Sequence, residues 1–138
     1  FSEADPSKFY FPLIDDDNFG YRRVNVAQQR GDPDSLLNRM RTMMAVRKAN
    51  PAFARGDFKV LEPENKAVLA FLRTWEGVNL LAVNNLSTEP QTVALDLAAF
   101  AGATPVDLFT GERLPVVTAE PWPLALGPSG YRWLSITS

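Results

Sequence analysis

A run of acidic residues near the start of the chain is the first place where the sequence could bind a metal. Residues 15–18 read Asp-Asp-Asp-Asn, and Gly20 stands at the sixth position of an EF-hand loop that begins at Asp15. The match then fails, because Phe19 occupies the fifth position and Val26 the twelfth, where calcium requires a bidentate Glu. We therefore interpret the run as a solvated or helix-capping loop.

The remaining residues offer little catalytic chemistry. The chain has no His and no Cys, which excludes a Ser-His-Asp triad, a cysteine nucleophile and imidazole or thiolate metal sites. A retaining glycosidase needs two carboxyl groups roughly 5–5.5 Å apart. Sixteen Asp and Glu residues make chance pairs easy, but none has a recognisable catalytic setting. The sequence thus predicts no catalytic, cofactor-binding or metal-binding residue.

The three tryptophans could bind a sugar directly, because an indole face can stack on a pyranose ring. Trp75 adjoins a hairpin turn and Trp122 opens a strand, so the two could form a carbohydrate-binding platform. Trp133 lies within an alternating strand and is expected in the core. Three tryptophans in a β domain more often serve packing, so the platform is the less favoured interpretation.

The first half of the chain is predicted to contain an irregular segment followed by one helix. Residues 1–31 show no sustained period but are rich in aromatics, and we expect them to pack against something outside this chain; a self-packed arm is the alternative. A helix is predicted over residues 33–50. Asp32 would be its N-cap, Pro33 its first residue, and Pro51 would end it. Its apolar face contains Leu36, Leu37, Met40, Met43 and Met44.

From residue 57 onward the apolar period changes to two, which is typical of strands. Strands are predicted at 57–62, 67–74, 78–84, 92–97, 104–109, 114–117, 122–126 and 131–137, with Leu69, Phe71, Leu81 and Val83 facing the core. Turn signals separate them at 8–12 residue spacing, which favours an antiparallel β-sandwich or barrel. The predicted fold class is therefore mainly β, an antiparallel sandwich preceded by one α-helix and an irregular segment.

Composition limits the partners. The chain has 138 residues with 14 Lys and Arg against 16 Asp and Glu, a net charge of −2, and its basic residues are scattered, so a nucleic-acid partner is not expected. No apolar stretch approaches the roughly 20 residues that span a membrane. The absence of Cys fits a reducing compartment, and we expect a cytoplasmic protein. Because the chain begins with Phe1, it is expected to be a processed product or a piece of something longer.

Several stretches resemble the end of the catalytic region and the C-terminal domain of the α-amylase superfamily, glycoside hydrolase family thirteen. They are Val-Asn-Val-Ala-Gln-Gln at 24–29, Asp-Pro-Asp-Ser-Leu-Leu-Asn at 32–38, Arg-Lys-Ala-Asn-Pro-Ala-Phe at 47–53, Val-Asp-Leu-Phe-Thr-Gly-Glu at 106–112 and the closing strand at 126–134. The opening residues 1–6, 11–14 and 20–26 are similar to the trehalose synthase branch, which interconverts maltose and trehalose. Residues 15–19 depart from that branch and leave open a related α-glucosidase or α-amylase.

The resemblance implies that residues 1–52 end a (β/α)₈ barrel and residues 53–138 form a C-terminal all-β domain. Its main partner would be the missing barrel of the same chain, which would carry the catalytic carboxylates and bind maltose or trehalose. An oligomer of identical chains is also compatible with the family. Near the barrel's sugar site, Tyr10, Phe19 or Tyr21 would line the substrate. The chain alone would be an inactive structural domain.

Overall fold

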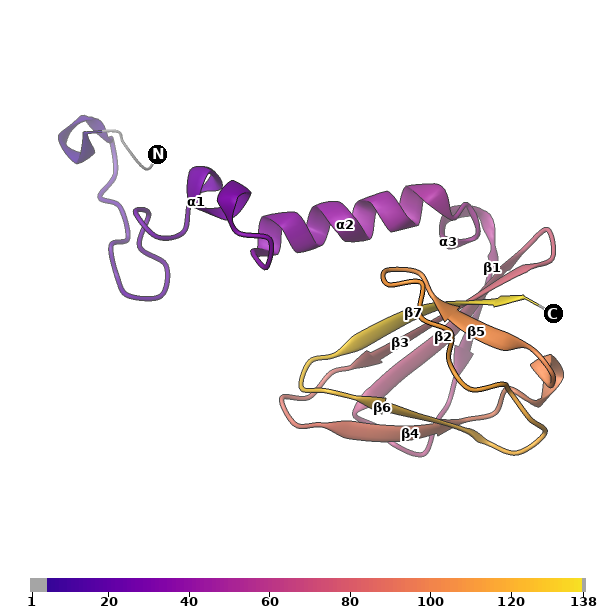
Figure 1. Ribbon diagram of the computed structural model, residues 1–138. Coiled ribbons are helices and arrows are strands. Elements are labelled where there is room, and N and C mark those ends of the chain that lie inside the picture. The colour runs from indigo at the N-terminus through magenta and orange to yellow at the C-terminus, as the bar shows by residue number, and fades with distance from the viewer. Residues whose placement is uncertain (1–4, 138) are drawn as a thin grey trace. The chain divides into compact units, whose positions relative to one another are not determined.

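A computed structural model describes residues 5–137, and these form two compact units that divide between Ala45 and Val46 (Figure 1). The helices are α1 (Val26–Gly31), α2 (Leu36–Ala49) and α3 (Ala52–Arg55), with single 3₁₀ turns at Pro6–Lys8 and Ala98–Phe100. The strands are β1 (Asp57–Leu61), β2 (Val68–Trp75), β3 (Val78–Asn85), β4 (Gln91–Leu95), β5 (Thr104–Asp107), β6 (Trp122–Leu126) and β7 (Tyr131–Thr137).

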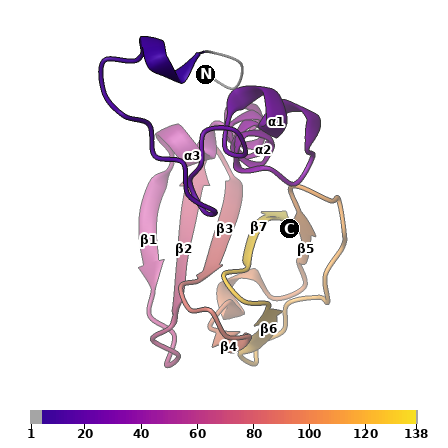
Figure 2. The ribbon, with the colours of Figure 1, turned by 90° about the vertical axis from the view of Figure 1, so that its left-hand side faces the viewer.

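The second unit is an antiparallel β-sandwich, as the sequence predicts. One sheet has five strands in the order β1-β2-β3-β7-β5, and the other consists of β4 and β6. Figures 1 and 2 show β1, β2 and β3 side by side, with β4 and β6 in a separate layer. The core between the layers contains Leu81 and Val83 of β3 and Leu134 and Ile136 of β7, all fully buried.

The five-stranded sheet is apolar on its other face as well, and this overturns three predicted core positions. On β2 it is Ala70 and Leu72 that enter the core, whereas Leu69 is exposed and Phe71 half-buried on the opposite side. Trp133 is also half-buried on that outer face instead of lying in the core. Because both the odd-numbered and the even-numbered residues of β2 are largely apolar, alternation alone could not decide which of the two sets faces the core.

One predicted strand does not form. Residues 114–117 run along β5 through the hydrogen bonds Leu114 N to Pro105 O (2.9 Å) and Val117 N to Ala103 O (2.9 Å), without a regular ladder. They nevertheless cover the otherwise free edge of β5. Strand β5 itself ends at Asp107, two residues short of the prediction, because Asp107 begins a turn.

The helical region also differs from the prediction. Helix α2 starts at Leu36, because Ser35 caps it by accepting from the backbone N–H of Asn38 (3.3 Å). Asp32 instead turns the preceding loop by accepting from the N–H of Asp34 (2.9 Å), so Pro33 lies before the helix. The irregular opening segment contains the unexpected short helix α1, which Asn25 caps at the N–H of Gln28 (2.9 Å).

Two turns on the sandwich have clear local causes. Glu76 and Gly77 both have positive φ, 48° and 79°, which is the two-residue hairpin geometry that suits the twist of β2 and β3. The buried Asn85 side chain ties two other turns together. Its amide donates to the carbonyls of Glu89 (2.7 Å) and Gly127 (2.8 Å), and its carbonyl accepts from Ser87 (2.9 Å).

We expect Asn85→Ala to lower the free energy of unfolding by about 2 kcal/mol, because three hydrogen bonds to backbone groups are lost at once. Asn84→Ala is the matched control, since Asn84 is a half-buried neighbour on the same strand. Urea unfolding of the 138-residue chain measures both. Equal losses in the two variants would show that Asn85 does not hold these turns.

Candidate functional site: an aromatic docking face

The outer face of the five-stranded sheet contains an apolar row that crosses four strands. The strand register places Val60, Phe71, Ala82 and Trp133 directly beside one another. Residues paired in this way point to the same side of a sheet. The row therefore forms a continuous apolar band on the side that faces away from the core.

Helix α3 covers the middle of this band. Its Phe53 ring lies 4.7 Å from the ring of Trp133, and its Ala52 is 1% exposed. Arg73 fastens the helix to β2, since its Nε donates to the Ala52 carbonyl at 3.2 Å. Beneath it Leu80 and Ala82 are fully buried, although neither belongs to the sandwich core.

The rest of the band is open. Phe58 is 56% exposed, Val60 46% and Leu69 39%. Phe58 packs on Phe71 with ring centres 5.1 Å apart, so the exposed part has a defined shape. We call the whole surface the aromatic face; it consists of Phe53, Phe58, Val60, Leu69, Phe71, Phe109, Tyr131 and Trp133. An apolar patch of this kind on one side of a domain marks an interaction site.

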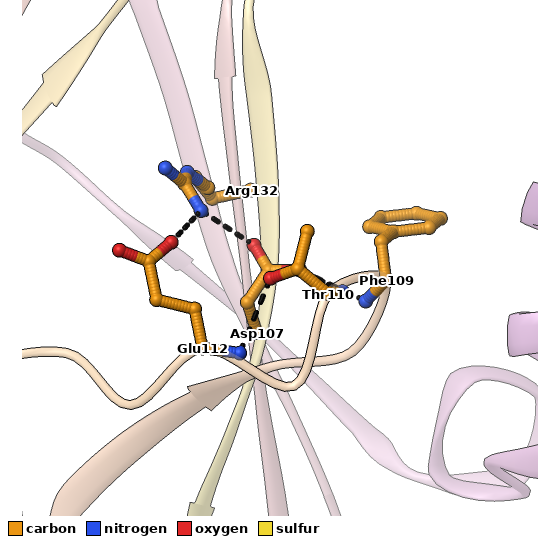
Figure 3. A network of polar contacts seen from close by, with 5 residues as sticks. All are labelled: Asp107, Phe109, Thr110, Glu112 and Arg132. Atoms are coloured by element: carbon orange, nitrogen blue, oxygen red, sulfur yellow. Dashed lines mark hydrogen bonds and ion pairs between the residues drawn. The ribbon is translucent and has the colours of Figure 1, made fainter.

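An ionic network on the turn after β5 sets one end of the aromatic face. Asp107 is 3% exposed and accepts hydrogen bonds from the N–H groups of Phe109 (2.8 Å) and Thr110 (3.0 Å) and from Arg132 Nη1 (3.0 Å). Arg132 also contacts Glu112 at 2.8 Å. Figure 3 shows the Phe109 ring on the far side of this turn from Glu112. The network thereby fixes the turn that carries Phe109.

The fixed turn places Phe109 against β7. Its ring lies 5.2 Å from that of Trp133 and 5.4 Å from that of Tyr131. Aromatic pairs at this spacing stabilise beyond the area they bury, by about 0.5–1.5 kcal/mol. The Val-Asp-Leu-Phe-Thr-Gly-Glu motif at residues 106–112 therefore has a structural role, in which its Asp orders the turn and its Phe completes the aromatic face.

The same contacts shift the pKa values of Asp107 and Arg132. Burial opposes ionisation of Asp107, but the hydrogen bonds from Arg132 and from the two backbone N–H groups outweigh it and lower the pKa of this carboxyl. Hydrogen bonds to Asp107 and Glu112 raise the pKa of the Arg132 guanidinium. Both groups are thus held in their charged forms, as a structural ion pair requires.

The proposed two-tryptophan platform does not exist in the structure. Trp122 is 3% exposed, and its indole N–H donates to the Pro115 carbonyl at 3.0 Å, so it is a core residue. Trp75 is half-buried and has the guanidinium of Arg55 over its ring, 5.4 Å from the centroid. Neither indole is a free stacking surface.

In the first unit, apolar side chains are exposed. Phe19 is 71% exposed and lines, together with the half-buried Tyr21, a hollow of about 770 Å³ formed by residues 12–30. Tyr10 does not line the hollow; it packs edge-on against Phe11 and is 92% exposed. A role of these three residues at a sugar site stays a prediction.

The acidic run at residues 15–18 forms a turn. One oxygen of Asp16 accepts from the N–H groups of Asn18 and Phe19, and the Gly20 N–H donates to the Asp16 carbonyl at 2.9 Å. In residues 5–137 there is no group of three or more Asp, Glu, His or Cys side chains arranged to hold a metal ion. The interpretation as a loop agrees with this geometry.

Helix α2, which the boundary between the two units crosses, exposes several large apolar side chains. None of its side chains is buried, and Leu36 is 71%, Met40 48% and Met44 57% exposed. A short isolated helix is marginal in water, and in proteins such a face is normally covered. No helix in the described part of the chain is long and apolar enough to cross a membrane.

The sequence of this chain is similar to those of known proteins. The family described as Maltogenic Amylase, C-terminal domain, matches residues 58–133, more than half of the chain. The chain belongs to this family. It is 42% identical to the trehalose synthase/amylase of Mycobacterium tuberculosis over 100% of this chain and 24% of that protein. It is 40% identical to the trehalose synthase of a Pimelobacter species over 99% of this chain and 25% of that protein.

The fold comparison agrees. The trehalose-6-phosphate hydrolase of Bacillus licheniformis superposes on 94% of this chain and 22% of its own with a TM-score of 0.73, and at 21% identity this shows a shared fold. The sequence identities to the two trehalose synthases confirm the resemblance to the trehalose synthase branch. The chain spans about a quarter of the length of these curated relatives.

The pH dependence of stability tests the Asp107 network. We expect Asp107→Asn to lower the free energy of unfolding by about 3 kcal/mol near neutral pH, because Arg132 and the turn lose a buried anion. The folded pKa lies below the ordinary value of an Asp carboxyl, 3.8, so the contribution of Asp107 is complete above that value and is lost as pH falls through the folded pKa.

The gap between wild type and Asp107→Asn should therefore be constant above about pH 5 and narrow below about pH 4. Glu112→Gln, at an exposed side chain, should cost less than about 1 kcal/mol and serves as the control. Denaturant unfolding at a series of pH values measures the gap. A gap that does not change with pH would contradict the assigned role of the ionised carboxylate.

Proposed function

We propose that this chain is the C-terminal part of a trehalose synthase-like enzyme and that it acts there as a scaffold. Residues 1–52 would complete the catalytic barrel, and residues 53–138 would form the β domain that supports it. The observation that carries the proposal is the identity of about two residues in five to trehalose synthases along the whole chain. The enzyme would act in the cytoplasm on maltose as an isomerase.

The exposed apolar surfaces support the scaffold role. The aromatic face and the bare side of α2 both present large side chains that water disfavours. Covering the remaining surface of a half-exposed Phe or Met stabilises by about 1 kcal/mol. Several such residues together are enough to hold two domains in a fixed arrangement, and the rest of the enzyme is the natural occupant of these surfaces.

The reaction itself would take place outside this chain. In the proposed mechanism a carboxylate nucleophile forms a glucosyl-enzyme from maltose, and the retained glucose then attacks it through its anomeric hydroxyl. Two displacements preserve the α configuration, as in retaining glycosidases. The carboxylate of Asp107 is buried and paired with Arg132, which fits a structural role. We therefore expect this chain to contribute position and stability to the reaction and no acid, base or nucleophile.

The scaffold role predicts a difference between the isolated chain and the full-length enzyme. Phe58→Ser should change the stability of the 138-residue chain by less than about 1 kcal/mol, since Phe58 is already 56% exposed there. In the full-length enzyme the same change should cost about 2 kcal/mol, because the ring would leave a buried contact. Thermal unfolding of both proteins measures the two effects.

Leu86→Ser is the matched control, since Leu86 is 69% exposed on a turn outside the aromatic face. If Phe58→Ser and Leu86→Ser affect the full-length enzyme equally, the aromatic face does not contact the barrel. Proton NMR of the full-length enzyme with maltose tests the activity separately, and trehalose is the expected product. Glucose as the only product would make the enzyme a hydrolase and leave the scaffold result unaffected.

A further inference from the structure

A groove lies on the open side of the sandwich, beside strand β1. Its volume is about 680 Å³, and it is bounded by β1, the loop after β1, and β4. Consecutive residues of both strands line it, 59–61 of β1 and 92–95 of β4. Because successive side chains of a strand point in opposite directions, such a lining means that the groove runs along the backbone edges of the two strands.

Both edges are terminal in their sheets. β1 pairs only with β2, and β4 pairs only with β6. On β4 part of the edge is occupied, because the Asn65 amide donates to the carbonyl of Thr92 at 3.0 Å and to Gln91 Oε1 at 2.9 Å. Within residues 5–137 the backbone of β1 makes hydrogen bonds only to β2. Alternate N–H and C=O groups of β1 therefore face the groove unpaired.

The groove has an acidic rim. Glu62, Glu64 and Asp96 line it, all three are exposed, and none of them takes part in an ion pair in the described part of the chain. Lys59 is the single cation among the lining residues. The balance favours a positively charged occupant, because opposite charges across an interface select the partner and its register.

The base of the groove is apolar. Leu61, Val93 and Leu95 line it, and Val93 and Leu95 belong to the sandwich core. An extended segment with alternating side chains would direct one set toward these residues and the other toward the acidic rim. This pattern differs from a sugar site, which would need an aromatic ring to stack on, and none lines the groove.

A second copy of the chain is a poor occupant. A symmetric antiparallel pairing of two β1 strands centred on Lys59 would place two ammonium groups directly opposite each other. Lysines at sheet edges generally prevent such self-pairing. A basic segment of another protein can place its Lys or Arg side chains next to the three carboxylates. In a register that keeps these side chains away from Lys59, no like charges lie opposite each other.

We propose that this groove binds an extended, lysine- or arginine-containing peptide segment of another protein, which adds as a strand to the free edge of β1. Backbone hydrogen bonds to β1 supply the affinity, and the carboxylates of Glu62, Glu64 and Asp96 supply the charge preference. The proposal rests on the groove itself and not on the scaffold function, although Val60 belongs to both the groove lining and the aromatic face.

The test uses the isotopically labelled 138-residue chain and the peptide acetyl-Lys-Val-Arg-Val-Lys-Val-amide. Saturable amide shifts confined to β1, the 62–65 loop and β4 are expected. The variant Glu62→Gln/Glu64→Gln/Asp96→Asn should weaken binding at least about tenfold, because the charge preference is lost. Two further peptides of the same sequence have N-methyl groups at alternate residues, one on each backbone edge. Both keep their charge, but the one that is methylated on the edge facing β1 cannot form the backbone hydrogen bonds and should not bind.

The matched control variant is Asp17→Asn/Glu76→Gln/Glu89→Gln, which removes the same number of carboxylates elsewhere and should leave the affinity unchanged. If both triple variants weaken binding equally, or if both N-methylated peptides still bind, the peptide is held by general charge attraction and the proposal is wrong. Concentration-dependent dimerisation that the groove variant abolishes would make a second copy the occupant and would equally overturn it.

Discussion

The sheet β1-β2-β3-β7-β5 is apolar on both faces, and the need to cover the second face governs most of the structure. The inner face is covered by β4 and β6 and forms the sandwich core. Within the described residues of the β domain, the four-residue helix α3 covers part of the outer face, where it buries Leu80 and Ala82 and leaves Phe58, Val60 and Leu69 in contact with water. An antiparallel sheet with one solvent-exposed face normally has polar residues on that face. The apolar residues here therefore indicate a surface that binds another part of the protein or a partner.

The other conspicuous features of the β domain serve that face. The Asp107–Arg132–Glu112 network is polar and charged, yet its effect is to hold the turn that places Phe109 on Trp133. Arg73 crosses the face to hold α3 through the Ala52 carbonyl and also lies over the Phe58 ring at 5.6 Å. Charged side chains thus position aromatic ones, and the resulting surface is both apolar and shaped.

Much of this could be predicted from the sequence. The change of apolar period near residue 57 predicts the strands, and the turn residues predict where most of them end. Two kinds of error remain. Leu69, Phe71 and Trp133 were expected in the core, because a strand that is apolar at both parities does not reveal which face lies inside. Helix α2 has its N-cap at Ser35 instead of Asp32, because two residues with capping side chains compete and only tertiary contacts of the loop decide between them.

The functional features were less accessible. A carbohydrate platform was conceivable from Trp75 and Trp122, but the side-chain direction of Trp122 depends on its pairing with β4, which a single sequence does not specify. The groove beside β1 could not be predicted either, because it depends on which strands are terminal in their sheets. The signal that could have indicated the aromatic face was the run of apolar residues on both sides of β2, which is typical of a strand that is covered on both faces.

The most direct test of a covered second face is hydroxyl-radical footprinting of the 138-residue chain alone and of the same residues within the full-length enzyme. Phe58 and Tyr131 on the aromatic face and Met40 and Met44 on α2 should be oxidised readily in the isolated chain and protected in the enzyme. Leu86, which lies outside both surfaces, should react equally in the two. Equal oxidation of Phe58 and Tyr131 in both proteins would contradict the account, because the aromatic face would then remain open to water.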